Sequence, residues 1–174
     1  MESFAVKVAV LVLAAVHSTK SAPLSSDHTV SFSVGLSSTQ NVYNKDTIKY
    51  DIIFVNEHNG YNPSTGVFTC PVPGLYVFHF HAYSSNKDTI MWLDLLHNGN
   101  VMVSVSGYNS HTVGSQTVLL KLQLGDRVQI QSKESQEFAL FGLPQQIYST
   151  FTGYVLHPDS HQHLHDSGSA AVGK

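Results

Sequence analysis

Hydrophobic and polar residues alternate along much of this chain with a period of two. The segment 30–36 places hydrophobic side chains at every even position, and the segments 76–81 and 118–124 repeat the pattern. A period of two is typical of strands that bury one face, whereas an amphipathic helix repeats about every 3.6 residues. No stretch combines a helical period with capping residues. The pattern therefore predicts an all-β protein.

Two dipeptides mark tight turns between strand-like segments. Asn98-Gly99 separates MWLDLLH from VMVSVSG, and Asn-Gly is the strongest short-range signal for a β-hairpin. Gly125-Asp126 separates two further strand-like runs. Many short strands joined by turns are typical of a β-sandwich or barrel.

Length, composition and charge narrow the possible functions. The 174 residues suit one domain, and a hydrophobic share of 42% supplies a core. The formal net charge is −3 and Arg127 is the only arginine, so no nucleic-acid partner is expected. The motifs GxGxxG, GxSxG and HExxH are absent, which argues against nucleotide binding and against an enzyme. Cys70 is the only cysteine, and we predict a buried free thiol, with an inter-chain disulfide as the alternative.

Residues 1–21 have the order of a secretory signal peptide. Lys7 is followed by nine apolar residues at 8–16, and then by small and polar residues up to a cleavage point between residues 18 and 22. The alternative is a membrane anchor, but the apolar run is shorter than the roughly 20 residues that a spanning helix needs. We therefore expect a secreted, extracellular protein without a membrane span.

The composition changes after His157, where large apolar residues become rare. We expect the folded unit over residues 28–157 and a disordered, His-rich tail over 158–174. Four candidate metal ligands lie within nine residues: His157, His161, His163 and His165. Imidazole groups at this density can bind zinc or copper. The alternative is a solvated polar tail without a ligand.

A set of spaced aromatic, asparagine and glycine residues begins at position 50. Its members are Tyr50, Asn56, Tyr61, Phe68, Gly74, Tyr76, Phe78 and Phe80. The later segment STFTGYVL contributes Phe151 and Gly153, and LKLQLGDRVQI lies between the two sets. Together these three parts of the sequence, in this order along the chain, resemble the globular domain of complement C1q. The resemblance covers about residues 28–157. That family begins its signature with phenylalanine, where this chain has Tyr50.

The resemblance implies a ten-stranded jelly-roll β-sandwich of the C1q and tumour necrosis factor type, assembled as a homotrimer. Alternate aromatic residues would fill the space between two sheets. Gly74 would let the chain turn from a proline-flanked loop into a strand. Phe151 and Tyr154 would lie on opposite faces of the last strand, one inward and one toward a neighbour. Members of this family are secreted recognition modules without enzymatic activity, and several use calcium.

Loops are the expected ligand surface, because a rigid scaffold often carries its binding residues on loops. The segments 56–65, 83–89 and 108–115 are rich in Asn, Ser, Tyr and His. Their ligand-binding candidates are Asn59, Tyr61, Asn62, Asn86, Asp88, Tyr108, Asn109 and His111. The alternative is ordinary turn composition. His79 and His81 share one face of their strand, where a structural or interface role is favoured over metal binding.

Three functions stay open. The first is a soluble innate-immune lectin that binds glycans or microbial surface molecules, with avidity from three copies of each loop. The second is an extracellular metal-binding or mineral-matrix protein that uses the His-rich tail. The third is a ligand of a cell-surface receptor, of cerebellin or cytokine type. A collagen-like G-X-Y repeat is absent, which puts any recruitment of complement proteases in doubt.

Overall fold

The computed structural model describes residues 29–85, 89–108, 111–135 and 137–159. These residues form strands, bridges and turns, and none of them lies in a helix. The described part of the chain therefore offers no helix with the length and apolar character needed to cross a membrane. The predicted signal peptide and the tail beyond Asp159 lie outside the described residues.

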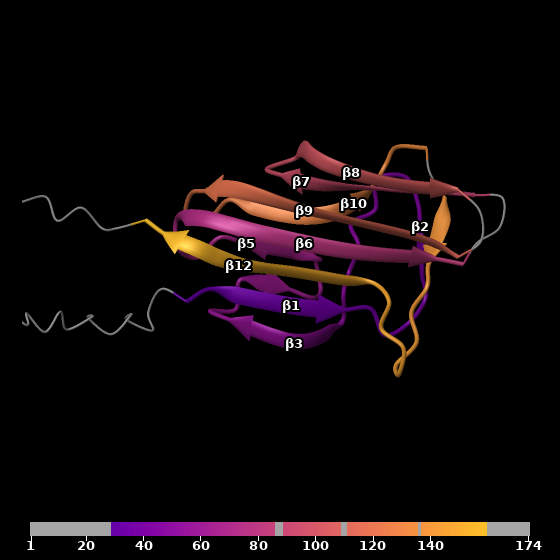
Figure 1. The fold of residues 1–174 in the computed structure, drawn as a ribbon, viewed down its shortest axis with the longest axis horizontal. Coiled ribbons are helices and arrows are strands. Elements are labelled where there is room, and N and C mark those ends of the chain that lie inside the picture. Colours follow the sequence, from indigo (N-terminus) through magenta and orange to yellow (C-terminus); the bar gives the residue numbers. More distant parts are fainter. Residues whose placement is uncertain (1–28, 86–88, 109–110, 136, 160–174) are drawn as a thin grey trace, which may run out of the picture.

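Ten strands form two five-stranded antiparallel sheets that pack face to face (Figure 1). The first sheet has the order β3 (Ile52–Glu57), β1 (Ser31–Gly35), β12 (Thr150–Pro158), β6 (Gly74–Ser84) and β9 (Thr112–Leu122). The second has the order β4 (Tyr61–Asn62), β5 (Val67–Thr69), β10 (Arg127–Ser132), β7 (Ile90–His97) and β8 (Asn100–Tyr108). The predicted ten-stranded jelly-roll sandwich is confirmed. A separate two-stranded sheet of β2 (Gln40–Val42) and β11 (Phe138–Leu140) is an addition that the pattern did not reveal.

Side chains alternate along β6 as the sequence predicts. Tyr76, Phe78 and Phe80 are fully buried between the sheets. His79 and His81 lie on the opposite face of the strand, where His79 is half-buried and His81 is exposed. Successive side chains of a strand point to opposite faces, so burying the aromatic set places both histidines outside the core.

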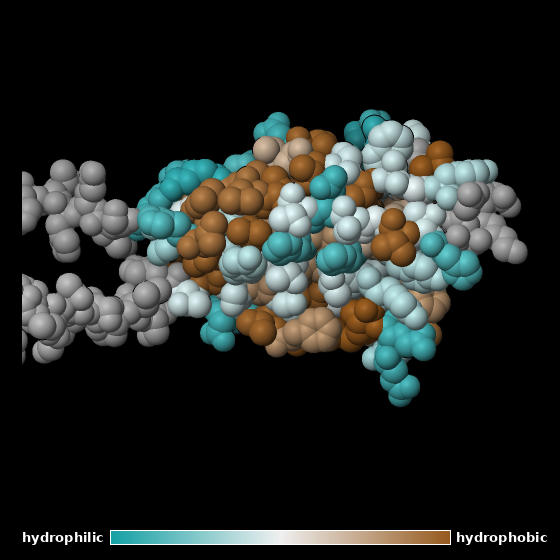
Figure 2. Space-filling model, in the orientation of Figure 1, coloured by the Kyte–Doolittle hydropathy of each residue, from teal (hydrophilic) through white to brown (hydrophobic). Residues whose placement is uncertain are grey.

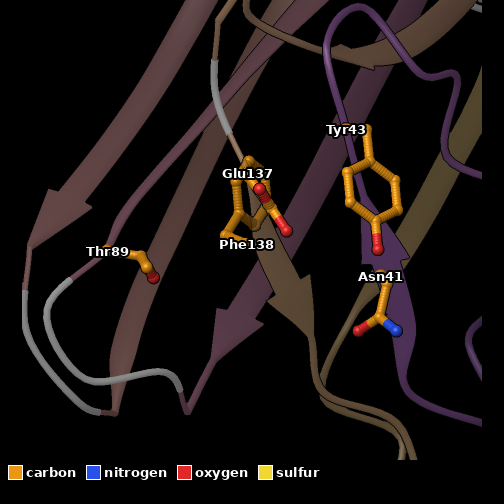
Figure 3. A pocket seen from close by; sticks show the side chains of 5 residues that line it. All are labelled: Asn41, Tyr43, Thr89, Glu137 and Phe138. Atoms are coloured by element: carbon orange, nitrogen blue, oxygen red, sulfur yellow. The ribbon is translucent and has the colours of Figure 1, made fainter.

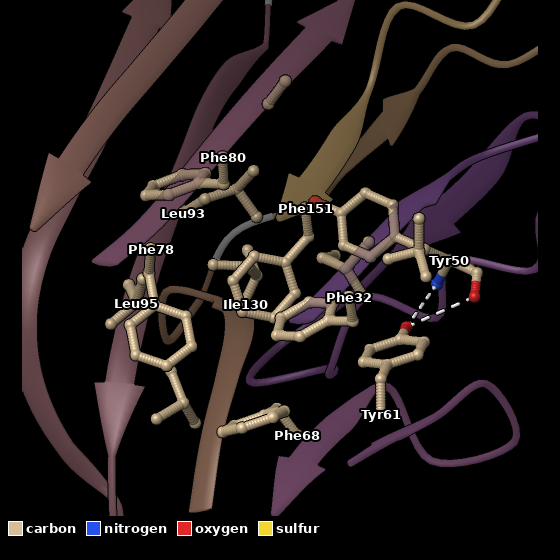
Figure 4. Close-up of a cluster of buried hydrophobic side chains, with 14 of the residues drawn as sticks. Phe32, Tyr50, Tyr61, Phe68, Phe78, Phe80, Leu93, Leu95, Ile130 and Phe151 are labelled. Carbon is tan, nitrogen blue, oxygen red and sulfur yellow. Dashed lines mark hydrogen bonds between the residues drawn. The ribbon is translucent and has the colours of Figure 1, made fainter. Parts of the chain in front are cut away.

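Aromatic rings fill the space between the two sheets (Figure 4). The ring of Phe32 lies 5.0 Å from Phe68, 5.3 Å from Tyr61 and 4.9 Å from Phe151, measured between ring centroids. Such stacked and edge-to-face pairs add about 0.5–1.5 kcal/mol each to the free energy gained by burial. The aromatic residues of the sequence signature are therefore core residues.

Asn56, the asparagine of the signature, holds the turn between β3 and β4. Its side-chain amide donates to the Tyr61 carbonyl (2.9 Å), and its side-chain oxygen accepts from the Tyr61 amide (3.1 Å). The Tyr61 hydroxyl in turn donates to the Tyr50 carbonyl (3.2 Å) and accepts from the Tyr50 amide (3.0 Å; Figure 4). Asn56 and the Tyr61 hydroxyl thus bond backbone groups of Tyr61 and Tyr50.

The two glycines of the signature are required by close packing. A Cβ atom at Gly153 would lie 2.5 Å from the ring of Phe32 and 2.7 Å from the ring of Phe78. A Cβ atom at Gly74 would lie 2.6 Å from the carbonyl oxygen of His157 on the neighbouring strand. The prediction that Gly74 serves a turn is therefore wrong. It already lies within β6, where the β12 backbone leaves no space for a side chain.

Replacing Tyr50 with phenylalanine should stabilise the protein. The Tyr50 side chain is fully buried, and its hydroxyl has no hydrogen-bond partner among the described residues. Burial also raises the pKa of this hydroxyl well above its ordinary value. An unsatisfied buried polar group costs about 1–3 kcal/mol, so Tyr50→Phe should raise the free energy of unfolding by up to that amount. Urea unfolding at one fixed protein concentration measures the change.

The matched control is Tyr61→Phe, because the Tyr61 hydroxyl makes both of its hydrogen bonds to the Tyr50 backbone. Removing that hydroxyl leaves a buried amide and a buried carbonyl unpaired, so this variant should be less stable by about 1–3 kcal/mol. If the free energy of unfolding changed in the same direction in both variants, the roles assigned to the two hydroxyl groups would be wrong.

The sandwich has two distinct ends. At the first, Gly74 of β6 pairs with Pro158 of β12 and Leu122 of β9, and both described chain ends lie there (Figure 1). We call this the terminal end. At the other, Ser84 of β6 pairs with Thr112 of β9. We call this the loop end.

Both predicted turns are confirmed at the terminal end. Asn98 and Gly99 have φ angles of 50° and 82° and connect β7 to β8, as a two-residue hairpin requires. Gly125, with a φ of 83°, lies in the turn between β9 and β10. The amide of Gly125 donates to the carbonyl of Cys70 (2.9 Å). The Cys70 thiol is free and buried as predicted, and burial raises its pKa.

Candidate functional site

The loop candidates that the structure describes do not form one site. Asn59 lies in the β3–β4 turn, beyond the paired residues Glu57 and Ser31, and therefore at the terminal end. Tyr108 and His111 lie at the loop end, where β8 leads into β9. Because the long strands run from one end of the sandwich to the other, loops that are close in the chain can fall at opposite ends of the molecule.

Two of the loop candidates serve the fold. Tyr61 is only 2% exposed, and the prediction that it contacts a ligand is wrong. The Asn-rich sequence around it reads as a loop, but Tyr61 begins strand β4, which turns its side chain into the core. Asn62 is exposed, yet its side-chain oxygen accepts from the Ser64 amide (2.9 Å) and its carbonyl accepts from the Gly66 amide (2.8 Å). Asn62 therefore caps its own turn.

Several predicted site residues fall outside the described ranges. They are Asn86, Asp88 and Asn109 among the loop candidates, and His161, His163 and His165 in the tail. His157 is described, and it is an exposed residue of β12 at the terminal end. Within the described ranges, no group of three or more His, Cys, Asp or Glu side chains is placed to hold a metal ion. Zinc or copper binding by the tail stays a prediction.

Two hollows that share Tyr43 and Glu137 as lining residues lie at the loop end. The first has a volume of about 250 Å³, and Figure 3 shows the side chains that line it: Asn41, Tyr43, Thr89, Glu137 and Phe138. The second has a volume of about 230 Å³ and is lined by Tyr43, Asn44, Ser135 and Glu137. We call these two hollows together the Tyr43 groove.

The Tyr43 groove combines polar groups with an exposed aromatic ring. Tyr43 is 50% exposed, and Asn41 and Glu137 are also exposed. The Thr89 hydroxyl is buried and has no hydrogen-bond partner among the described residues. Sequence reasoning missed most of this site and reached only Thr89, as the last residue of the segment 83–89. The other residues lie on or beside the three-residue strands β2 and β11, which are too short to show a period.

Hydrogen bonds hold the Tyr43 side of the groove in place. The Tyr43 amide donates to the Asp46 carboxylate (3.0 Å), and the Tyr43 carbonyl accepts from the Asp46 amide (2.9 Å) and from the Ser132 hydroxyl. The Asn44 side-chain oxygen accepts from the Ser135 amide (3.0 Å). This wall of the groove is therefore ordered before any ligand arrives.

Four aromatic side chains gather elsewhere at the loop end: Tyr83, His111, Phe141 and Tyr148. The ring of Tyr83 lies 4.9 Å from Tyr148 and 5.5 Å from Phe141, between centroids, and its hydroxyl bonds to His111 Nδ1. Tyr148 is 48% exposed. His111, a sequence candidate, thus belongs to a packed aromatic cluster that reaches the surface.

The outward face of the first sheet is polar in its middle (Figure 2). The hydroxyl oxygens of Ser33 and Thr152 lie 3.0 Å apart, and His79 Nδ1 lies 2.9 Å from the Thr117 hydroxyl. The His79 ring also stacks on Tyr154, with 6.0 Å between centroids. Both of these contacts of His79 are therefore made to residues of its own sheet.

Exposed apolar side chains lie in several places on the described surface, among them Ile53, Phe54 and Val55 on the edge strand β3. Two other groups are named here as patches. The face patch lies toward the terminal end of the first sheet and consists of Leu119, Tyr154 and Leu156. The edge patch lies on the outer strand β8 and consists of Val101 and Met102. Tyr154 and the fully buried Phe151 point to opposite sides of β12, as predicted.

A polar cluster surrounds Asp126 at the terminal end. Its carboxylate lies 3.0 Å from His97 Nε2 and accepts from the Asn98 side chain (2.8 Å) and from the Gln123 amide (2.8 Å). The Gln123 amide, with Asn98 and His97, lowers the pKa of Asp126 to about 2. These bonds join the β7–β8 turn to the β9–β10 turn, so the cluster holds two turns together.

The strand order, the aromatic core and the position of the loops define a jelly-roll domain of the type shared by C1q and tumour necrosis factor. The C1q domain family model matches residues 31–156, and the chain belongs to the C1q domain family. Complement C1q tumor necrosis factor-related protein 2 of Homo sapiens is 37% identical over 114 residues, which cover 64% of this chain. The Mus musculus protein of the same name is also 37% identical over 114 residues. The matched residues span only 39% and 38% of the lengths of those two relatives.

Solved structures have the same fold. The globular domain of zebrafish complement 1qA superposes with a TM-score of 0.60 at 26% identity, covering 75% of this chain and 99% of that domain. Eiger TNF from S. frugiperda gives a TM-score of 0.60 at 12% identity, covering 78% of this chain and 96% of the other. Murine APRIL gives 0.59 at 8% identity, covering 74% and 99%. At such low identities, Eiger and APRIL show a common fold alone.

Proposed function

We propose that this protein is a secreted recognition protein that binds glycans or microbial surface molecules through the loop end of a homotrimeric head. The observation that carries the proposal is the Tyr43 groove. It places exposed polar side chains and an aromatic ring at the end opposite the described chain ends. Ligand sites usually combine aromatic side chains with polar groups that fix the orientation of the ligand.

The face patch and the edge patch support self-association. Each is too small to define a partner by itself, but the face patch and the edge patch occupy different sides of the same domain. A contact between two different patches is heterologous, and repeated copies close into a ring when the rotation permits. The family resemblance implies that the ring has three members. Neither patch includes residues of the Tyr43 groove, so three grooves stay free.

Secretion is supported by the apolar segment at 8–16, which has the order of a signal peptide. A secreted trimer would present three copies of one loop end to a surface. Weak binding by each copy then becomes tight binding to a surface that carries many ligands.

The experiment is a binding measurement of the mature protein on a panel of microbial polysaccharides and oligosaccharides, with and without calcium. We expect saturable binding that survives truncation after His157. The same truncation should abolish any zinc or copper binding, because it removes His161, His163 and His165. Absence of binding to every glycan, with zinc or copper binding retained only in the full chain, would favour the metal-binding alternative.

The aromatic cluster favours a second candidate function, that of a ligand for a cell-surface receptor. Tyr83, Phe141 and Tyr148 form a preordered aromatic surface, and aromatic residues are enriched in the energetic centres of protein interfaces. The names of the two relatives also include tumor necrosis factor. Binding of the protein to intact cells, lost in Tyr148→Ala but unaffected by competing oligosaccharides, would support this function over the first.

A further inference from the structure

We propose that the Tyr43 groove binds a neutral disaccharide unit, with a sugar ring against Tyr43 and hydroxyl groups bonded by Glu137, Asn41 and Thr89. The inference rests on the proposed binding of glycans. It adds the role of each lining residue, the length of the sugar that the groove holds and the charge class that it selects.

The volume of the groove indicates two sugar rings. Each hollow alone, at about 250 and 230 Å³, falls below the range of about 300–1,000 Å³ that drug-sized ligands occupy. Tyr43 and Glu137 line both hollows, so one ligand can pass from the first into the second. A unit of two linked rings would place one ring on each side of this pair of residues.

The polar groups match the chemistry of sugar hydroxyls. The Glu137 carboxylate accepts hydrogen bonds, and the Asn41 side-chain amide both donates and accepts. The Thr89 hydroxyl lines the first hollow, is buried, and lacks a partner among the described residues. A buried hydroxyl without a partner is destabilising, and a ligand hydroxyl at this position would satisfy it.

The Tyr43 ring supplies the apolar contact that such a ligand needs. Half of the side chain is exposed, and its backbone is fixed by Asp46 and Ser132. An aromatic ring with a polar hydroxyl offers a flat apolar surface to the carbon–hydrogen face of a sugar and a polar tip to its edge. Because the wall is already ordered, little conformational entropy is lost on binding.

Among the described residues that line the groove, Glu137 is the only charged one, and it selects against acidic sugars. Glu137 lines both hollows and carries the negative charge of its carboxylate. The neighbouring Glu134 is bound to Lys45 (3.0 Å), so that lysine is already paired. A sulfate or carboxylate group on a sugar would meet a like charge at Glu137. Neutral hexoses and N-acetylated hexosamines avoid this repulsion.

The test is a titration of the mature protein with cellobiose, maltose, lactose, N,N′-diacetylchitobiose and a sulfated heparin disaccharide, followed by NMR. We expect at least one neutral disaccharide to shift the amide signals of Asn41, Tyr43 and Thr89, and the heparin disaccharide to leave them unchanged. Tyr43→Ala and Glu137→Gln should each weaken binding about tenfold or more. Both residues are exposed, so both variants should keep the melting temperature of the parent.

Phe54→Ala is the matched control, because Phe54 is an aromatic residue of β3 with a similar exposure (54%, against 50% for Tyr43) that does not line the groove. It should bind like the parent. Glycan binding that persists in Tyr43→Ala and Glu137→Gln, shifts confined to other residues of the loop end, or a preference for the heparin disaccharide would overturn this inference and leave the proposed binding of glycans by the loop end intact. No binding of any disaccharide or polysaccharide would overturn both.

Discussion

Replacing Phe32 with alanine is expected to lower the free energy of unfolding by about 3–5 kcal/mol. Phe32 is 1% exposed and lies against the rings of Tyr61, Phe68 and Phe151. The substitution removes buried apolar area and leaves a cavity. The paired strands around Phe32 cannot move together far enough to fill it. A loss of this size is a large part of the stability of an ordinary domain. Urea unfolding at one fixed protein concentration measures it.

Phe54→Ala is the matched control for this prediction. Phe54 lies on β3, beside β1, but it is 54% exposed. Its loss should therefore cost less than about 1 kcal/mol. Equal losses in the two variants would show that the packing around Phe32 is not the centre of the core.

Leu119→Glu is expected to convert the proposed trimer into monomers at micromolar concentration. Leu119 is 53% exposed on the outward face of β9, so the substitution leaves the single domain folded. In a ring of three, the same residue enters each of the three contacts. Burying a carboxylate without a partner costs several kcal/mol, and that cost would apply three times. Sedimentation velocity measures the change in mass.

The control for the trimer is Leu124→Glu, an equal change at a residue that is 70% exposed in the turn after β9. It should stay trimeric. Glycan binding gives a second readout: Leu119→Glu should lose binding to dense polysaccharide surfaces and keep the parent affinity for a soluble disaccharide. A parent protein that is already monomeric at micromolar concentration would refute the face patch as an interface.

Most buried side chains of the main strands could be predicted from the sequence, because which face of a strand is buried follows from the local spacing of its hydrophobic residues. Tyr76, Phe78 and Phe80 alternate with His79 and His81, and only one register puts all three rings in the core. The roles of Asn56 and Gly74 could not be obtained in this way. One depends on hydrogen bonds to Tyr61, and the other on the approach of a strand more than 70 residues away in the chain.

The candidate site was predicted less well, because the amino-acid composition of a loop does not indicate which other loops lie beside it in the fold. Asn59 and Tyr108 have the same kind of neighbours in the sequence, yet the fold places them at opposite ends of the sandwich. Tyr61 lies in an Asn-rich segment and is a core residue. Tyr43 and Glu137 come from two segments nearly 100 positions apart, and the pairing of β2 with β11 brings them together.

The sequence by itself determined the all-β class, the inward face of the main strands, two tight turns and membership of the family, because each of these depends on residue type at fixed local spacing. Only the tertiary structure decided which end of the sandwich carries each loop, which signature residues hold the backbone and where a groove opens. The hydrogen bonds of Asn56 depend on how the β3–β4 turn folds back onto Tyr61. The positions of the loops arise from strand pairing over long separations, and a groove exists only where side chains from distant segments leave a space between them.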